Sequence, residues 1–329
     1  MGQLFCCGKV NDYHHDQSQY LLQMNRYKEK NVYKKYEEPF SYNEPKDLEE
    51  NIISKNGKFS MLYYDINKNE TIIMEKKLED IRSLDGMSEI NFNNNLYICG
   101  NKFLYEINPL NPETIVLSDL NYWHCYPSLI SIKEKYIYCI GGKNQCHCEL
   151  YDIDTNTWSA LPNLPEERYL CSLCYDKKNN IIYLFGGINN KNEIHGKKLP
   201  IEYDYFLRLK EDLNIGLVWE KIMVKNNKNL LNRISAATLI FEGNENFIFI
   251  LGGEDEENHL LNDIIKYDIN NQSFIQLNHK LNFPTKFFNQ YSIKSDMNNF
   301  LYVFLDMFNN PINIDKHNFF ELNIDELKI

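Results

Sequence analysis

The chain has 329 residues, of which 43% are hydrophobic and 14% aromatic, so it is long enough to bury a sizeable core. Its net charge of −11 favours solubility and argues against a general nucleic-acid binder, which would need a basic face. The sequence has no run of about twenty apolar residues, as a transmembrane helix needs, and no helical patterns between strands, as an α/β fold needs.

Residues 1–50 differ in pattern from the rest and are predicted to form an N-terminal extension. The start, Met-Gly-Gln-Leu-Phe-Cys-Cys, is similar to an acylation signal in which Gly2 carries myristate and Cys6 or Cys7 carries palmitate. The usual myristoylation pattern has Ser or Thr where this chain has Cys6. One myristoyl chain binds membranes only weakly, with K about 10⁴ M⁻¹, so a palmitate would supply the second anchor. The alternative is an ordinary cytosolic start that packs against the folded domain.

Within this extension, residues 17–38 are predicted to form a helix. Tyr20, Met24 and Tyr27 follow one another at four- and three-residue spacing, which places them on one helical face. Pro39 would end the helix, because proline lacks the amide hydrogen that a helix interior requires.

Short apolar runs that end in glycine recur along the remainder of the chain. A glycine at the end of a strand permits positive φ and close approach of another backbone. Repetition at intervals of this size indicates a repeated structural unit. The runs are 97–100, 139–142, 184–187 and 250–253, with a fifth at 301–305 that is followed by Asp306 in place of glycine.

An aromatic residue followed by a carboxylate forms a second landmark, downstream of each run. Most copies continue with Ile or Leu and then Asn or Asp, which is typical of tight hairpin turns. The fourth copy is ambiguous, because Leu207-Arg208-Leu209 could equally be its strand. The six pairs are Tyr64-Asp65, Tyr105-Glu106, Tyr151-Asp152, Tyr203-Asp204, Tyr267-Asp268 and Phe320-Glu321.

The clearest copy spans residues 136–168 and contains, in order, Gly141-Gly142, Tyr151-Asp152, Trp158, Leu161-Pro162 and Arg168. This copy resembles the kelch repeat. Trp219 stands at the tryptophan position of the next copy, and Phe274 replaces tryptophan in the one after. The resemblance covers roughly residues 59–329 and implies a β-propeller with one four-stranded blade per repeat.

We therefore predict an all-β, kelch-type β-propeller over residues 51–329, with six blades of four antiparallel strands. The first copy lacks its inner strands and the last lacks its outermost one, so we expect strands near both termini to complete one blade. Segments 51–54 and 59–63 are the expected donors, and a strand over 31–36 is an alternative.

Cysteines and histidine cluster at Cys146-His147-Cys148, near Cys171 and Cys174, and could in principle hold zinc. Cys171 and Cys174 are three residues apart on a predicted strand, which points their thiols to opposite faces. The chain also has no nucleophile elbow, P-loop, zincin motif or dinucleotide-binding glycine pattern. We expect no metal, no cofactor and no catalytic residue.

The resemblance to kelch propellers implies a binding face formed by the loops that precede the inner strands. The candidate partner-binding residues in these loops are His124, Arg168, Tyr169, Arg233 and Lys286. Because arginine binds carboxylates through two parallel hydrogen bonds, an acidic peptide segment is the expected ligand. Alternatively, the arginines bond to local loop carbonyls or to Glu166 and Glu167. An insertion at 188–199 and 209–218 is a second candidate surface.

We predict a non-enzymatic module or scaffold that binds a protein partner and no nucleic acid. The alternative is an enzyme with its active site in the channel mouth, since the kelch family includes oxidases and epimerases. We expect a cytoplasmic protein, which acylation would hold on the cytoplasmic face of a membrane.

Overall fold

The computed structural model describes residues 2–3, 20–26, 58–65, 70–77, 86–93, 95–108, 114–189, 193–194, 197–198, 205–224, 226, 230, 232–240, 247–255, 257–281, 284, 300–304 and 319–323. The regular elements in these residues are all β-strands, which confirms the predicted all-β class. None of these residues belongs to a helix of the length and hydropathy needed to cross a membrane.

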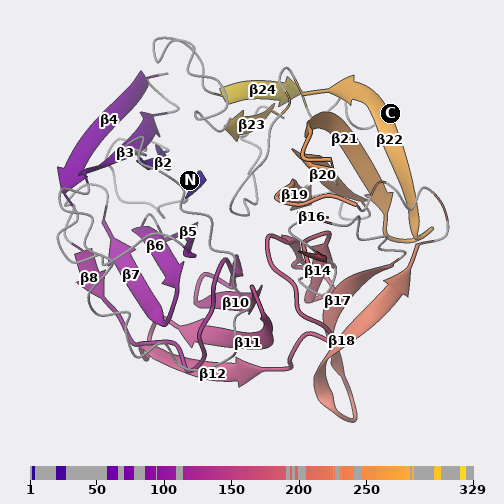
Figure 1. Ribbon diagram of the computed structural model, residues 1–329, viewed down its shortest axis with the longest axis horizontal. Coiled ribbons are helices and arrows are strands. Elements are labelled where there is room, and N and C mark those ends of the chain that lie inside the picture. The colour runs from indigo at the N-terminus through magenta and orange to yellow at the C-terminus, as the bar shows by residue number, and fades with distance from the viewer. Residues whose placement is uncertain are drawn as a thin grey trace.

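The described strands form five four-stranded antiparallel sheets and two two-stranded sheets. Figure 1 shows the sheets following one another around a common axis, in the order of the chain. In each four-stranded sheet, neighbouring strands follow one another along the chain, apart from the inserted hairpin β15–β16. This arrangement agrees with a propeller, while the number of six blades stays a prediction.

The first sheet is built from β1 (Gly2–Gln3), β2 (Tyr20–Arg26), β3 (Lys58–Asp65) and β4 (Glu70–Lys77). The prediction of a helix over 17–38 is therefore wrong over the described residues 20–26. Seven residues of β2 pair with β3, which provides backbone hydrogen bonds to a segment that would be marginal as an isolated helix.

The sheet also crosses the predicted boundary at residue 51, because β2 lies on one side of that boundary and β3 on the other. Segment 59–63 lies in β3 and is a strand, as predicted. Segments 31–36 and 51–54 lie outside the described residues.

Four further four-stranded sheets and the two-stranded pairs complete the described structure. The second sheet comprises β5 (Ser88–Phe92), β6 (Asn95–Gly100), β7 (Phe103–Ile107) and β8 (Thr114–Val116). The third comprises β9 (Ser128–Ile132), β10 (Tyr136–Gly142), β11 (Gln145–Asp152) and β12 (Thr157–Leu161). The fourth comprises β13 (Ser172–Asp176), β14 (Ile181–Phe185), β17 (Tyr205–Asp212) and β18 (Gly216–Met223), with β15 (Glu193–Ile194) and β16 (Lys197–Lys198) inserted. The fifth comprises β19 (Ala237–Ile240), β20 (Phe247–Glu254), β21 (Leu260–Asp268) and β22 (Ser273–Lys280), and the last pair is β23 (Phe300–Phe304) with β24 (Phe319–Asn323).

The double glycines lie at or directly after the ends of strands, as predicted, and in the structure these are the second strands of their sheets. Gly141 has φ +62° at the end of β10, and a Cβ atom there would overlap the carbonyl oxygen of Arg168 from the next loop. Glycine is required at this position both by the backbone conformation and by the close approach of that loop.

The aromatic landmark pairs with the tryptophan position across the two outer strands of a sheet. Tyr151 lies opposite Trp158, and Tyr267 lies opposite Phe274. In the fourth sheet Leu209 lies opposite Trp219, so Leu209 occupies the aromatic position. The assignment of that landmark to Tyr203-Asp204 is therefore wrong, and the alternative strand around residues 207–209 is correct.

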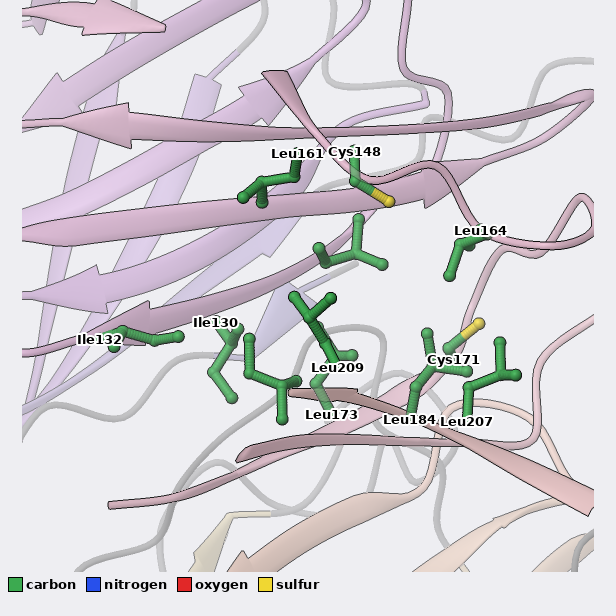
Figure 2. Close-up of a cluster of buried hydrophobic side chains, with 12 residues drawn as sticks. Ile130, Ile132, Cys148, Leu161, Leu164, Cys171, Leu173, Leu184, Leu207 and Leu209 are labelled. Carbon is green, nitrogen blue, oxygen red and sulfur yellow. The ribbon is translucent and has the colours of Figure 1, made fainter. Parts of the chain in front are cut away.

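Apolar clusters fill the space between neighbouring sheets. Figure 2 shows the cluster between the third and fourth sheets, which includes Leu161 and Leu164 from one side and Leu173 and Leu209 from the other. Cys148 and Cys171 lie within this cluster.

Cys174 belongs to a different cluster, between the fourth and fifth sheets. Cys171 and Cys174 thus face opposite sides of their sheet, as their spacing predicted. Burial raises the pKa of the thiols of Cys148 and Cys171 to about 12, as expected for cysteines that act as buried hydrophobic residues.

Candidate interaction face

Three successive loops that precede inner strands have the same local structure. His124, Arg168 and Arg233 each stand two residues before a residue with left-handed backbone conformation. Its φ is close to +55° in all three loops. The three residues are Tyr126 at +55°, Leu170 at +55° and Ser235 at +52°.

The side chains of these three residues reach the next sheet. His124 Nδ1 lies 2.7 Å from the carbonyl oxygen of Gly141. In the same way, Arg168 Nη1 donates to Gly186 O at 3.2 Å, and Arg233 Nη1 donates to Gly252 O at 2.8 Å. Each acceptor is the first glycine of a double-glycine pair.

The main-chain carbonyls of the same residues accept hydrogen bonds from the preceding sheet. Gly142 N donates to Arg168 O at 2.8 Å, and Gly187 N donates to Arg233 O at 3.1 Å. Asn101 N donates to His124 O at 2.6 Å. Each loop residue therefore joins two neighbouring sheets, and the three together link the second sheet to the fifth.

Both arginines are paired with carboxylates inside the protein. Arg233 donates to both carboxylate oxygens of Asp263, at 2.8 and 3.0 Å. Arg168 Nε donates to Glu166 at 3.2 Å, and its guanidinium lies 5.1 Å from the ring centre of Tyr205, whose hydroxyl also bonds Glu166. These pairs match the alternative in which the arginines bond local carbonyls and carboxylates.

The predicted partner-binding residues are thus mostly internal. His124 and Arg168 are fully buried, and Arg233 and Tyr169 are 6% and 8% exposed. The Tyr169 main chain exchanges hydrogen bonds with Ile188 at 3.1 and 2.9 Å. Direct contact of these side chains with a partner stays a prediction, and their burial argues against it. Lys286 lies outside the described residues.

Of the predicted acylation sites, Gly2 lies in β1, where it pairs with Met24. Cys6 and Cys7 lie outside the described residues. Acylation of these three residues stays a prediction.

A buried carboxylate that the sequence analysis did not single out holds the loop before β9. Glu149 accepts hydrogen bonds from the amide of Tyr122 at 2.9 Å, and from the amide and side-chain nitrogens of Asn121 at 2.9 and 2.7 Å. His124 Nε2 lies 3.0 Å from the same carboxylate. The available signal in the sequence was that Glu149 is the sole carboxylate between Gly142 and Asp152.

Burial and hydrogen bonding act on Glu149 in opposite directions. Burial by itself would raise the pKa of this carboxyl group, but the bonds from His124 and from the amides of Tyr122 and Asn121 lower the pKa below its usual value. Glu149 is therefore a buried anion whose hydrogen bonds hold Asn121, Tyr122 and His124 of this loop in place.

The same loop presents two aromatic side chains to solvent. Tyr122 is 38% exposed and Trp123 is 47% exposed. The Tyr122 ring stacks on His147, with ring centres 4.0 Å apart and planes 6° apart. His147 Nδ1 in turn lies 3.2 Å from the side-chain oxygen of Gln145. Sequence reasoning selected His124 from this loop, whereas the accessible side chains are its two aromatic neighbours.

One strand position supports the loop residues in all three sheets. When the sheets are aligned on Tyr151, Leu209 and Tyr267, the residues four positions earlier coincide. Each contacts a residue of the preceding loop, by ring stacking, cation–π contact or ion pairing. The three contacts are His147 with Tyr122, Tyr205 with Arg168, and Asp263 with Arg233.

Comparison with known proteins identifies the family. The family described as "KLHDC2/KLHL20/DRC7 Kelch-repeats domain" matches residues 128–323, which is more than half of the chain. A kelch repeat-containing protein of Dictyostelium discoideum is 29% identical over 162 residues, which cover 44% of this chain and 24% of the relative's length. The solved structure titled "Structure of YjhT" matches with a TM-score of 0.55 at 13% identity, covering 75% of this chain and 83% of YjhT, and it supports the fold alone. The chain belongs to the kelch-repeat family, and its fold is a kelch-type β-propeller.

Proposed function

We propose that this protein is a non-enzymatic interaction module that binds a protein partner through the face that carries Tyr122 and Trp123. Kelch-repeat domains are generally protein-interaction modules, and this chain belongs to that family.

The observation that carries the proposal is the exposure of two aromatic rings on a rigid support. Tryptophan and tyrosine are enriched among the residues that dominate binding energy at protein interfaces. Trp123 and Tyr122 project from a loop that the buried Glu149 holds through several hydrogen bonds. A rigid loop loses little conformational entropy when a partner binds, which favours affinity.

The chemistry of the neighbouring residues argues against a catalytic role for His124. Its ring is fully buried, and both nitrogens lie within hydrogen-bond distance of other groups, Gly141 O and Glu149. A general base must reach the proton that it removes from a substrate, so a ring held in this way is unsuited to that role.

An acidic peptide segment remains part of the proposal as the ligand of Arg168. In the protein the Arg168 guanidinium pairs with the carboxylate of Glu166. Glu166 is the more exposed member of this ion pair, with 23% of its side chain exposed against 0% for Arg168. An incoming carboxylate could take its place. If so, Glu166→Gln should strengthen binding of the partner, and raising the salt concentration should weaken it. Weaker binding by the Glu166→Gln variant would contradict an acidic ligand.

We further propose that acylation of Gly2, with Cys6 or Cys7, holds the protein on the cytoplasmic face of a membrane. Gly2→Ala removes the acceptor amino acid of myristate, so the membrane-associated pool should become soluble in cell fractionation. A wild-type protein that is already soluble, or a variant that stays on membranes, would contradict this proposal.

The binding proposal is tested by affinity purification of the full chain, followed by titration of the recovered partner. Trp123→Ala should weaken binding at least about tenfold, as expected for a central aromatic contact. Ile275→Ala is the matched control, because Ile275 is 52% exposed on the outer strand β22 of another sheet. Equal affinity of wild type and Trp123→Ala would overturn the assignment of this face.

A further inference from the structure

The outer hairpin of the fourth sheet, β17–β18, differs from those of the third and fifth sheets. In the third sheet the turn is Ile153-Asp154-Thr155-Asn156, and in the fifth it is Ile269-Asn270-Asn271-Gln272. The one aliphatic residue of each turn packs against a buried cluster, so the exposed part of both turns is polar. In the fourth sheet the turn contains Leu213 and Ile215.

The two aliphatic side chains at this turn are the most exposed large hydrophobic residues among those the structure describes. Leu213 is 103% exposed relative to its reference state, and Ile215 is 71% exposed. Single exposed aliphatic residues are common on protein surfaces. Two of them at one turn require a reason, because the aliphatic residues of the equivalent turns, Ile153 and Ile269, pack against buried clusters.

The β17–β18 hairpin is also longer than its equivalents. Seven positions separate Tyr151 from Trp158 and also Tyr267 from Phe274, whereas ten separate Leu209 from Trp219. Figure 1 shows the turn of this hairpin extending outward beyond the ring of sheets. The turn thus lies within the predicted insertion at 209–218 and away from the loops that carry Trp123.

The hairpin has a defined structure despite its projection. All eight residues of β17 pair with β18, from Tyr205 opposite Met223 to Asp212 opposite Gly216. Asp212 Oδ1 then accepts the turn amides of Asn214 at 2.9 Å and Ile215 at 3.3 Å. A turn held in this way presents its two side chains in one arrangement before any contact is made.

The base of the hairpin is anchored to the neighbouring sheet. Trp219 Nε1 donates to the carbonyl oxygen of Pro162 at 2.9 Å. Leu217 and Trp219 also pack against the cluster shown in Figure 2. The hairpin therefore has a fixed direction relative to the third sheet.

The charges around the turn indicate which kind of surface it fits. Glu211 and Asp212 precede the turn directly, and Glu211 is exposed. The cations Arg208 and Lys210 lie farther from the turn, and both pair with Glu220 at 2.8 Å. Carboxylates beside the apolar turn disfavour contact with an anionic lipid surface. A second copy of a chain with net charge −11 is also a poor match.

We propose that Leu213 and Ile215 insert into an apolar pocket of a partner protein whose rim carries Lys or Arg side chains. The pocket would bury the two side chains, and the basic rim would pair with Glu211 and Asp212. This site lies at the outer edge of the propeller and is independent of the face proposed above.

The test places a photo-crosslinking amino acid at position 213 of the full chain, expressed in its native cells. The same residue at position 155, where an exposed threonine stands in the equivalent turn of β11–β12, is the matched control. The protein crosslinked specifically from position 213 is then purified and titrated against the wild-type chain and three variants: Leu213→Ser/Ile215→Ser, Glu211→Lys and Asn214→Ser.

We expect the double variant to bind at least about thirtyfold more weakly, because the apolar contact is lost. Glu211→Lys should weaken binding at least about threefold and reduce its dependence on salt. Asn214→Ser should bind within about twofold of wild type, since it changes neither the apolar nor the charged contacts. Circular dichroism of each variant checks that the fold is retained.

Four results would overturn the proposal. They are crosslinking from position 213 no greater than from position 155, crosslinking of position 213 mainly to a second copy of the chain, crosslinking mainly to lipid, and equal binding by wild type and the double variant. The first and last exclude a docking role for the turn, and the other two assign it a different occupant.

Discussion

Arg233 and Asp263 are thirty positions apart in the chain and are joined by two parallel hydrogen bonds. Nη1 lies 2.8 Å from Oδ1, and Nη2 lies 3.0 Å from Oδ2. Nη1 also donates to the carbonyl oxygen of Gly252 at 2.8 Å. The Arg233 side chain therefore holds the loop before β19 to strands β20 and β21.

Removing the carboxylate from this pair should be strongly destabilising. Asp263→Ala leaves the buried Arg233 guanidinium without its counter-charge, which we expect to cost about 3–5 kcal/mol of unfolding free energy in urea. Glu220→Ala is the control, because Glu220 pairs with Arg208 and Lys210 at the surface and should cost about 1 kcal/mol or less. Similar losses of unfolding free energy for the two variants would show that the Arg233–Asp263 pair stabilises the protein no more than a surface ion pair does.

Glu149 should make stability depend on pH in the acidic range. Its pKa is lower in the folded protein than its usual value of 4.5, so the unfolded state binds more protons at acidic pH. Its contribution is complete above that value and is lost as the pH falls through the lower, folded-state pKa. Glu149→Gln should destabilise the protein by about 2 kcal/mol at neutral pH.

The measurement is urea unfolding of wild type and Glu149→Gln at a series of pH values. The difference between the two should shrink as the pH falls below 4.5, the usual value of the group. A difference that is constant with pH, or that grows toward acid, would contradict an ionised Glu149.

Two glycine substitutions separate the effect of backbone conformation from that of close approach. Gly141 and Gly216 both have positive φ, at +62° and +78°. A Cβ atom at Gly141 would overlap Arg168 O, whereas one at Gly216 has no atom within 4 Å. Gly216→Ala should therefore cost about 1–2 kcal/mol from conformation alone. Gly141→Ala should cost at least about 3 kcal/mol, because the steric term is added. Equal costs would mean that the loop containing Arg168 moves away from the new Cβ atom at little cost in free energy.

The buried cysteines should resist alkylation in the folded protein. Burial raises the pKa of the thiols of Cys139, Cys148, Cys171 and Cys174, which suppresses the reactive thiolate at neutral pH. Among the described cysteines, only Cys125 and Cys146 are partly exposed. Mass spectrometry after brief iodoacetamide treatment should find label on these two before the others. Early labelling of Cys171 would show that the cluster in Figure 2 opens readily.

The fold was predictable where a pattern is local and repeats. The double glycine at Gly141-Gly142 and the pairing of Tyr151 with Trp158 lie within one sheet, so their spacing carries the structural information. The fourth landmark failed because this sheet has an insertion and Leu209 replaces the aromatic residue. The helix prediction failed for residues 20–26 because the spacing of Tyr20 and Met24 also fits a strand, and pairing with β3 decides between them.

The candidate site was only partly predictable, because its chemistry depends on contacts between distant residues. The sequence placed cations in the loops, and the partner of Arg168, Glu166, was visible two residues away, but the partner of Arg233, Asp263, lies thirty positions later in the chain. Likewise, the loop sequence Tyr122-Trp123-His124 does not reveal which ring is buried. The contact with Glu149, more than twenty positions later in the chain, holds the His124 ring in the interior.

The most direct test of the proposed function is hydroxyl-radical footprinting of the wild-type chain, free and bound to its purified partner. Trp123 and Tyr122 are exposed in the free protein and should oxidise readily. Partner binding through this face predicts that oxidation of both rings slows at least about threefold, because interfaces exclude solvent from their central aromatic residues. The exposed Ile275 on β22 should be unaffected and serves as the internal reference. Unchanged oxidation of Trp123 and Tyr122 in the complex would contradict the account.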